Sequence, residues 1–269
     1  MCLLIFAHQL SADYPLMVAA NRDEFYARPT APAAFWPEYP GLLAGRDLEQ
    51  GGTWMGVTRE GRFAAVTNYR DPDVAMPAPR SRGELPLDYL AGSTTPASYL
   101  AELAKRGGEY AGFNLLVGDR DSLWYFANSG GQAPRALSPG LYGLSNARLD
   151  TPWPKVERGK AMLLSLQQGD GVSHDDLAQL VADRTRADPH SLACQGLNDT
   201  MDRTLSAQFI VTEGYGTRSS TTLWTESSGS IHWRELSFGE EGELSGARAE
   251  VMEPWSRSVK TRLNPPGCG

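Results

Sequence analysis

The stretch CLLIFAH, residues 2–8, sets the fold prediction, because it opens the chain with an apolar run that a second run, PLMVAAN (15–21), soon follows. Runs rich in branched or aromatic residues and bounded by Gly, Pro or Asp are typical of β-strands. TWMGVT (53–58) and RFAAVTN (62–68) form another such pair, and the Arg-Glu-Gly segment 59–61 supplies the glycine of a tight turn. The first third of the chain is therefore predicted to form consecutive hairpins.

Helices and strands follow in groups along the rest of the chain. One helix is predicted over 96–106 between a Thr95 cap and two glycines, one over 154–168 with proline in its first turn, and one that begins at Ser173. Further strands are predicted at FNLLVGD (113–119), SLWYFAN (122–128), GLYGLSN (140–146), LSAQFIVT (205–212), SSTTLWT (219–225) and SIHWREL (230–236). The segments 26–46, 69–84 and 239–250 read as loops.

This grouping indicates an α+β fold. Strands that come in runs favour antiparallel sheets over a regularly alternating parallel sheet, and two such sheets packed face to face with helices outside fit the elements. No long linker interrupts the chain, so residues 1–269 are interpreted as a single domain with a loop-like tail from about residue 254.

Composition and charge exclude several classes of function. The net charge of −7 argues against nucleic acid as a partner, and no apolar run is long enough for a membrane span. The three cysteines form no CxxC pair and the four histidines show no metal-binding spacing, so neither a metal nor another cofactor is predicted. Cysteine usage and the lack of a secretory signal favour a cytoplasmic location.

Cys2 is the first candidate for chemistry. Methionine aminopeptidases remove Met1 when a small residue follows, and Cys2 would then carry both a thiol and a free α-amine, which is basic enough to take the thiol proton near neutral pH. The alternative is a buried cysteine that begins a strand, because cysteine is among the most buried residue types.

The next polar cluster lies directly after the second apolar run, at Asn21, Arg22, Asp23 and Glu24. Four polar side chains at a strand end are suited to hold an amine and a substrate group. A turn with a solvated charge pair is the alternative interpretation.

Five ordered segments of the chain together carry a family resemblance. They are MCLLIFA (1–7), VAANRDEFYARPT (18–30), GGTWMGVTREGRFAAVTNYRDP (51–72), GLYGLSNARLDTPWPKV (140–156) and YGTRSSTTLW (215–224). In these segments the sequence resembles the NRDE protein family, also called the transport-and-Golgi-organisation family. That family is similar to N-terminal nucleophile (Ntn) hydrolases of the penicillin V acylase and bile salt hydrolase branch, which implies a four-layer αββα sandwich.

The resemblance also implies roles for five residues. Cys2 corresponds to the nucleophile, Asp23 to the carboxylate beside the α-amine, and Asn68 to a side-chain amide that stabilises the oxyanion. Asn146 would hold the substrate carbonyl or the amine from the opposite sheet, and Arg218 would support the carboxylate or the closing strand. Strand-terminal asparagines and a surface ion pair are the alternatives.

One position departs from the acylase pattern. An arginine lies three residues before the aspartate in that branch, whereas this chain has Ala20 there and Arg22 immediately before Asp23. Neighbours along a strand point to opposite faces, so Arg22 is not expected to replace the missing arginine.

The substrate pocket is predicted from Asn21, Arg22, Trp54 and Tyr69, although core packing is the common fate of aromatic residues. Two functions stay open. The first is a cysteine hydrolase that cleaves a linear amide (N-acyl) bond through a Cys2 thioester. The second is a non-catalytic binding or chaperone protein on the same scaffold, because the resemblance also implies haem trafficking and lipid metabolism with haem or acyl-CoA as ligands. A scaffold protein of secretory organisation ranks third, since the sequence offers no partner motif.

Overall fold

The computed structural model describes residues 2–69, 78–169, 171–193 and 200–254, and these build two seven-stranded antiparallel sheets. The first sheet has the strand order β10-β1-β2-β12-β13-β14, with β11 paired to β12. Its strands are β1 (Cys2–His8), β2 (Leu16–Phe25), β10 (Gly140–Leu144), β11 (Val211–Thr212), β12 (Tyr215–Thr225), β13 (Ile231–Phe238) and β14 (Leu244–Met252).

The second sheet follows the chain order from β3 to β9. Its strands are β3 (Thr30–Trp36), β4 (Tyr39–Asp47), β5 (Met55–Thr58), β6 (Phe63–Asn68), β7 (Phe113–Gly118), β8 (Leu123–Ala127) and β9 (Arg135–Ala136). The second sheet therefore consists of successive neighbours along the chain, whereas the first combines hairpins with two long-range pairings, β10 with β1 and β2 with β12.

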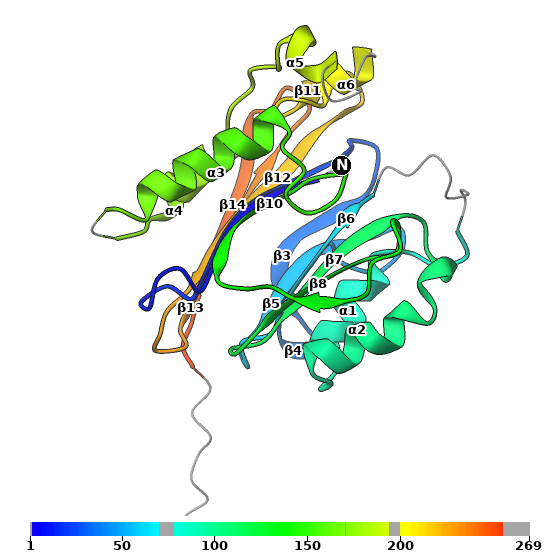
Figure 1. Ribbon diagram of the computed structural model, residues 1–269, viewed down its shortest axis with the longest axis vertical. Helices are drawn as coiled ribbons and strands as arrows, with labels where there is room; N and C mark the ends of the chain where they lie inside the picture. Colours follow the sequence, from blue (N-terminus) through cyan, green and yellow to red (C-terminus); the bar gives the residue numbers. More distant parts are fainter. Residues whose placement is uncertain (1, 70–77, 170, 194–199, 255–269) are drawn as a thin grey trace, which may run out of the picture.

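Helices cover the outer face of each sheet (Figure 1). On the second sheet lie α1 (Glu84–Ala91) and α2 (Pro96–Ala104), followed by a 3₁₀ turn (Gly107–Glu109); on the first lie α3 (Pro154–Leu166) and α4 (His174–Gln179), followed by α5 (Pro189–Ala193) and α6 (Thr200–Thr204). One apolar core lies between the sheets and one lies under each helix layer. The predicted αββα sandwich is confirmed.

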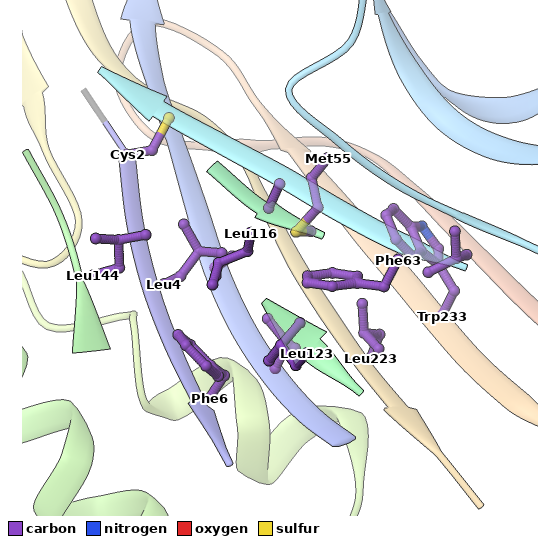
Figure 2. Packing of buried hydrophobic residues seen from close by; sticks show 14 of the residues in the cluster. Cys2, Leu4, Phe6, Met55, Phe63, Leu116, Leu123, Leu144, Leu223 and Trp233 are labelled. Carbon is purple, nitrogen blue, oxygen red and sulfur yellow. The ribbon is translucent and has the colours of Figure 1, made fainter. Parts of the chain in front are cut away.

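The strand β1 explains why the chain begins with an unbroken apolar run. Leu4 and Phe6 point into the core between the sheets, whereas Leu3 and Ile5 point into the core beneath the helices. A strand that is buried on both faces needs apolar residues at every position rather than at alternate ones. Figure 2 shows Cys2, Leu4 and Phe6 in a row along this strand, with Cys2 at its end.

Local signals predicted from the sequence are confirmed in the hairpin of β5 and β6 and at two helix starts. Gly61 occupies the turn with φ +89°, a conformation that favours glycine. The Thr95 side chain accepts a hydrogen bond from the Ser98 N–H, and the Ser173 side chain accepts one from the Asp176 N–H, so both residues cap helices.

Two segments predicted as loops contain strands, so those predictions are wrong. The edge strand β3 and most of β4 fall within 26–46, and most of the edge strand β14 falls within 239–250. Pro32 does not exclude β3 because an edge strand needs hydrogen-bond donors on one side only. The charged residues of β14 are tolerated because this edge strand is mostly exposed to solvent.

Two other local predictions also need correction. The strand predicted over 205–212 exists only at its end, in β11, because Ala207, Phe209 and Ile210 bury their apolar side chains without pairing in a sheet. The helix α1 begins at the end of the predicted 69–84 loop and was not predicted, since its first turn follows a segment rich in proline and charge.

The tail predicted from about residue 254 lies almost wholly outside the described residues, as do residues 70–77 of the predicted loop. The single-domain interpretation stays a prediction. In the described part of the chain, no helix is long and apolar enough to cross a membrane.

Candidate active site

A cleft of about 650 Å³ opens between the two sheets at the end where β1 begins. Both sheets contribute to its wall: Cys2 and Arg22 come from the first, and Thr30 and Asn68 come from the second. Trp54, from the segment that leads into β5, also lines it. Cys2 therefore lies in a cleft whose wall carries many polar and charged side chains.

Cys2 lies in the wall of this cleft and is only 8% exposed. Its strand position is fixed by pairing with Arg22 on β2, and the Ser145 hydroxyl donates a hydrogen bond of 3.0 Å to the Cys2 carbonyl. Burial raises the pKa of the Cys2 thiol, while the Arg22 charge acts in the opposite direction. The thiol is thus protonated at neutral pH, and a reaction at sulfur requires a nearby base.

Asp23 provides a buried carboxyl group beside Cys2. Its Oδ1 accepts a hydrogen bond of 2.7 Å from the Thr217 hydroxyl on β12, and the residue is 2% exposed. Burial raises the pKa of the Asp23 carboxyl, whereas the Lys155 charge and the Thr217 hydrogen bond act to lower it. After burial, the charge of Asp23 also acts to raise the pKa of the Cys2 thiol, so the carboxyl group and the thiol interact.

Arg22 lies on the same face of β2 as Ala20, so the two positions are not on opposite faces of the strand. Whether Arg22 takes the role of the missing arginine stays a prediction. The side-chain pattern of a strand repeats every two residues, which places positions 20 and 22 together. Ala20 is in the core between the sheets, and Arg22 continues that face into the cleft directly across from Cys2. A guanidinium group therefore faces the thiol from the next strand.

A β-bulge on β12 brings Arg218 to the cleft. The pairing with β2 shifts register between Thr217, which lies opposite Asp23, and Ser219, which lies opposite Arg22. Because a bulge inserts an extra residue, Arg218 and Ser219 both line the cleft. The Arg218 Nη1 donates to three carbonyls, those of Phe25, Tyr26 and Arg28. Two roles were predicted for Arg218, support of the carboxylate and support of the closing strand. Its hydrogen bonds to backbone carbonyls fit the second role.

Asn68 and Asn146 contact each other at the ends of two strands in different sheets. Asn68 lines the cleft at the end of β6, and its backbone carbonyl accepts a hydrogen bond of 3.0 Å from the Asn146 amide. Asn146 follows β10, which pairs with β1 in the same sheet, so its predicted position in the opposite sheet is wrong. It is 1% exposed and links the two sheets beside Cys2.

The structure separates the other predicted pocket residues. Trp54 lines the cleft with Arg22. Asn21 points to the helix side, where its amide donates to the carbonyls of Val181 and Gln208. Tyr69 packs against the core between the sheets and does not line the cleft.

Two charged residues near Cys2 were not predicted from the sequence. Lys155, at the second position of α3, is 2% exposed and is coupled by its charge to Asp23 and Cys2. Arg82, just before α1, lines the cleft and is coupled to the charges of Cys2 and Glu24. Their distance from Cys2 along the chain gives no signal, although a lysine within the apolar face of an N-terminal helical turn is unusual enough to single out Lys155.

Six arginines line the cleft, and they differ in how their charges are balanced. Arg28, Arg46 and Arg80 make close ion pairs with carboxylates, and Arg22 lies 3.9 Å from Glu24. Arg82 and Arg218 donate only to backbone carbonyls and form no ion pair with any residue that the structure describes. Burial lowers the pKa of both guanidinium groups. The cleft thus holds two partly buried positive charges that an anion could neutralise.

A comparison with known proteins gives the family. The family model for Transport and Golgi organisation 2 matches residues 1–240. The chain belongs to this family.

Within residues 2–254, apart from the gaps, no group of three His, Cys, Asp or Glu could hold a metal ion.

Relatives in the Transport and Golgi organisation 2 family cover most of the chain. The Bos taurus Transport and Golgi organization protein 2 homolog is 38% identical over 242 residues, which is 84% of this chain and 87% of that protein. The Homo sapiens homolog is 36% identical over 241 residues with the same coverage. The Drosophila melanogaster Transport and Golgi organization protein 2 is 25% identical over 259 residues, which is 87% of this chain and 91% of that protein.

A solved structure agrees with the fold of this family member. The C2A mutant of conjugated bile acid hydrolase from Clostridium perfringens aligns with a TM-score of 0.55 over 94% of this chain and 92% of that chain, at 8% sequence identity. At this identity the likeness concerns the fold alone. It confirms the Ntn-hydrolase-like sandwich that the resemblance implies.

Proposed function

We propose that the protein is a cysteine hydrolase that cleaves a linear amide bond in a substrate with an anionic group. The observation that carries this proposal is the position of Cys2: the second residue of the chain lies in the wall of a cleft, beside a buried carboxyl group and across from Arg22. A thiol that served only the apolar core would not need this polar surrounding.

The reaction begins once Met1 has been removed. The Cys2 thiol gives its proton to the α-amine, and the sulfur attacks the carbonyl carbon of the amide. The resulting ammonium then protonates the amide nitrogen, the C–N bond breaks, and an amine leaves while a thioester stays on Cys2. A water molecule next gives a proton to the α-amine and attacks the thioester carbonyl. The carboxylic acid departs and the sulfur recovers its proton.

Asp23 and Asn68 support these steps from opposite sheets. Asp23 orients the α-amine by accepting a hydrogen bond from it, and the Thr217 hydroxyl fixes the carboxylate. The Asn68 side-chain amide, at the cleft end of β6, donates to the oxyanion. Removing one oxyanion donor typically raises a reaction barrier by about 2.7–4 kcal/mol. In this proposal Asn146 positions Asn68, and Asn21 belongs to the support of β2 rather than to the pocket.

The arginines supply the preference for an anionic substrate. Arg82 and Arg218 have no carboxylate partner among the described residues, and desolvated guanidinium groups bind carboxylate or phosphate strongly. An acyl amide whose amine portion ends in a carboxylate places its charge near these groups while its carbonyl lies at Cys2.

The experiment begins with the intact mass of the untagged protein, which should lack Met1. Hydrolysis of N-dodecanoylglycine and of neutral N-dodecanoylethanolamine is then compared in wild type, Cys2→Ser and Cys194→Ser. We expect Cys2→Ser to lose at least about 100-fold in kcat/KM, because a hydroxyl is a much weaker nucleophile at neutral pH. Cys194→Ser, which removes another thiol, should retain full activity. Equal turnover in Cys2→Ser and wild type would refute the hydrolase.

A second candidate function is non-catalytic binding of haem or acyl-CoA in the same cleft. The two arginines without carboxylate partners favour it equally, because propionates and phosphates are anions. Retention of Met1, together with binding of dodecanoyl-CoA by the Cys2→Ser variant in calorimetry, would favour this function. A haem titration without a Soret shift at micromolar protein would exclude the haem version.

A further inference from the structure

Lys155 is a buried cation on the helix side of the first sheet. It is the second residue of α3 and is 2% exposed. Its Nζ donates a hydrogen bond of 2.9 Å to the Leu205 carbonyl, and its own backbone carbonyl accepts one of 3.0 Å from the Gln208 amide. These two contacts hold α3 against the segment before β12 and direct the ammonium group beneath the strands.

Gln208 links Lys155 to the part of β2 that carries Asp23. The Gln208 amide donates to the Lys155 carbonyl, and the Gln208 carbonyl accepts from the amide of Asn21, two residues before Asp23. Burial raises the pKa of the Asp23 carboxyl, whereas the charges of Lys155 and, from the cleft side, Arg22 act to lower it. Burial lowers the pKa of Lys155 to about 8, although Asp23 and Cys2 oppose that change.

We propose, building on the hydrolase function above, that Lys155 is a positioning residue whose ammonium group offsets the charge of Asp23 and thereby keeps the α-amine of Cys2 neutral. A neighbouring carboxylate favours the protonated form of an amine, and a neighbouring cation disfavours it. With Asp23 alone, the α-amine would stay protonated at neutral pH and could not accept the thiol proton. Lys155 removes this obstacle without entering the cleft.

The position of Lys155 separates this role from that of the cleft arginines. Arg22 and Arg82 line the cleft, where a substrate anion can neutralise them. Lys155 lies on the other side of β2 and does not line the cleft, so its charge acts on the site whether or not a substrate is bound. Below its pKa of about 8, the Lys155 ammonium therefore acts on the base rather than on substrate binding.

The test compares Lys155→Met with Lys160→Met in full-length chains whose Cys2 is exposed by cleavage of a removable N-terminal fusion. Lys160 is a matched control because it lies on the same helix but pairs with Asp150 at 2.9 Å. Trace acetylation by acetic anhydride, followed over pH by mass spectrometry of the N-terminal peptide, gives the midpoint at which the α-amine becomes neutral.

We expect the midpoint in Lys155→Met to rise by about one pH unit and that of Lys160→Met to match wild type. The acidic limb of kcat/KM for N-dodecanoylglycine should move in the same direction. If Lys155→Met does not fold, Lys155→Gln provides the same loss of charge, and Lys155→Arg should restore the wild-type midpoint.

An unchanged midpoint in Lys155→Met would overturn the proposal, even if the variant were less active, because it would leave Lys155 with only a structural part. The labelling needs no turnover. If the protein hydrolyses no amide, the proposed hydrolase function is refuted. The labelling midpoint of the α-amine still shows whether Lys155 affects the protonation of that amine.

Discussion

The two faces of β2 contact different parts of the molecule, although the residues of both faces alternate along the short segment from Ala20 to Asp23. Ala20 and Arg22 face the space between the sheets, and Arg22 reaches the cleft. Asn21, between them, faces the helices and is fully buried in hydrogen bonds to Val181 and Gln208. A motif that reads as one polar cluster thus divides into a cleft-facing half and a supporting half, and only the strand pleat separates them.

Substitutions on the two faces of β2 should impair different properties of the protein. A substitution on the helix face should reduce stability and leave the chemistry of the folded molecules intact. One on the cleft face should change ligand binding at little cost in stability. Four variants test this division.

The largest effect is expected for Asn21→Leu. It leaves the carbonyls of Val181 and Gln208 and the hydroxyl of Ser220 without their buried partner, so we expect the free energy of unfolding to fall by about 3 kcal/mol. Urea denaturation measures the loss. A stable Asn21→Leu protein with a damaged cleft would contradict the division of the two faces.

Lys155→Met should change how stability depends on pH. The folded-state pKa of Lys155 lies near 8, below its value in the unfolded chain, so the unfolded state binds more protons between these values and stability rises with pH. Relative to Lys155→Met, wild type should gain about 2–3 kcal/mol between pH 8 and 10. Parallel urea titrations at several pH values check this, and parallel curves for the two proteins would show that Lys155 titrates normally.

Thr217→Val tests the hydrogen bonds by which Thr217 on β12 joins Asp23 on β2 to Ile210. The Thr217 hydroxyl donates to Asp23 and accepts from the Ile210 N–H, and both groups are buried. We expect a loss of about 2 kcal/mol in the free energy of unfolding. Thr217→Ser, which retains the hydroxyl, serves as the control and should recover most of the loss.

The smallest effect is expected for Arg22→Gln. Its guanidinium lies in the cleft and contacts Thr30 at 3.3 Å, with Glu24 at 3.9 Å. We expect KM for N-dodecanoylglycine to rise about tenfold, equivalent to about 1.4 kcal/mol, with a smaller change for the neutral ethanolamide. A drop in stability as large as that of Asn21→Leu would place Arg22 in the supporting half instead.

The sequence predicts the apolar strands well because burial on both faces leaves a strong pattern. CLLIFAH and RFAAVTN became β1 and β6, and the Thr95 and Ser173 caps lie where their side chains indicate. Edge strands such as β3 and β14 are not predicted, because an edge strand tolerates proline and charged residues on its unpaired side and so lacks a clear apolar pattern. The helix α1 was also missed, because the proline and charged residues before it give only a weak helix signal.

The candidate site is predictable only in part. The family resemblance brings Cys2, Asp23 and Asn68 together, and the structure places them around one cleft or beside it. The approach of Arg82 and Lys155 to Cys2 depends on how the outer layers pack rather than on spacing along the chain. The sequence offers a signal only for Lys155, as a lysine on the apolar face of a first helical turn. Arg22 and Ala20 share one face of β2 because they are two residues apart, whereas Asp23 alternates with Arg22.

The position of Cys2 also matters for anyone who prepares the protein. β1 begins inside the cleft and is held between β10 and β2, so whatever is fused before residue 2 starts within the same opening. Under the proposed hydrolase function, an amino-terminal affinity tag would block the α-amine of Cys2 and occupy the cleft. Activity assays therefore need protein from which the tag has been cleaved directly before Cys2.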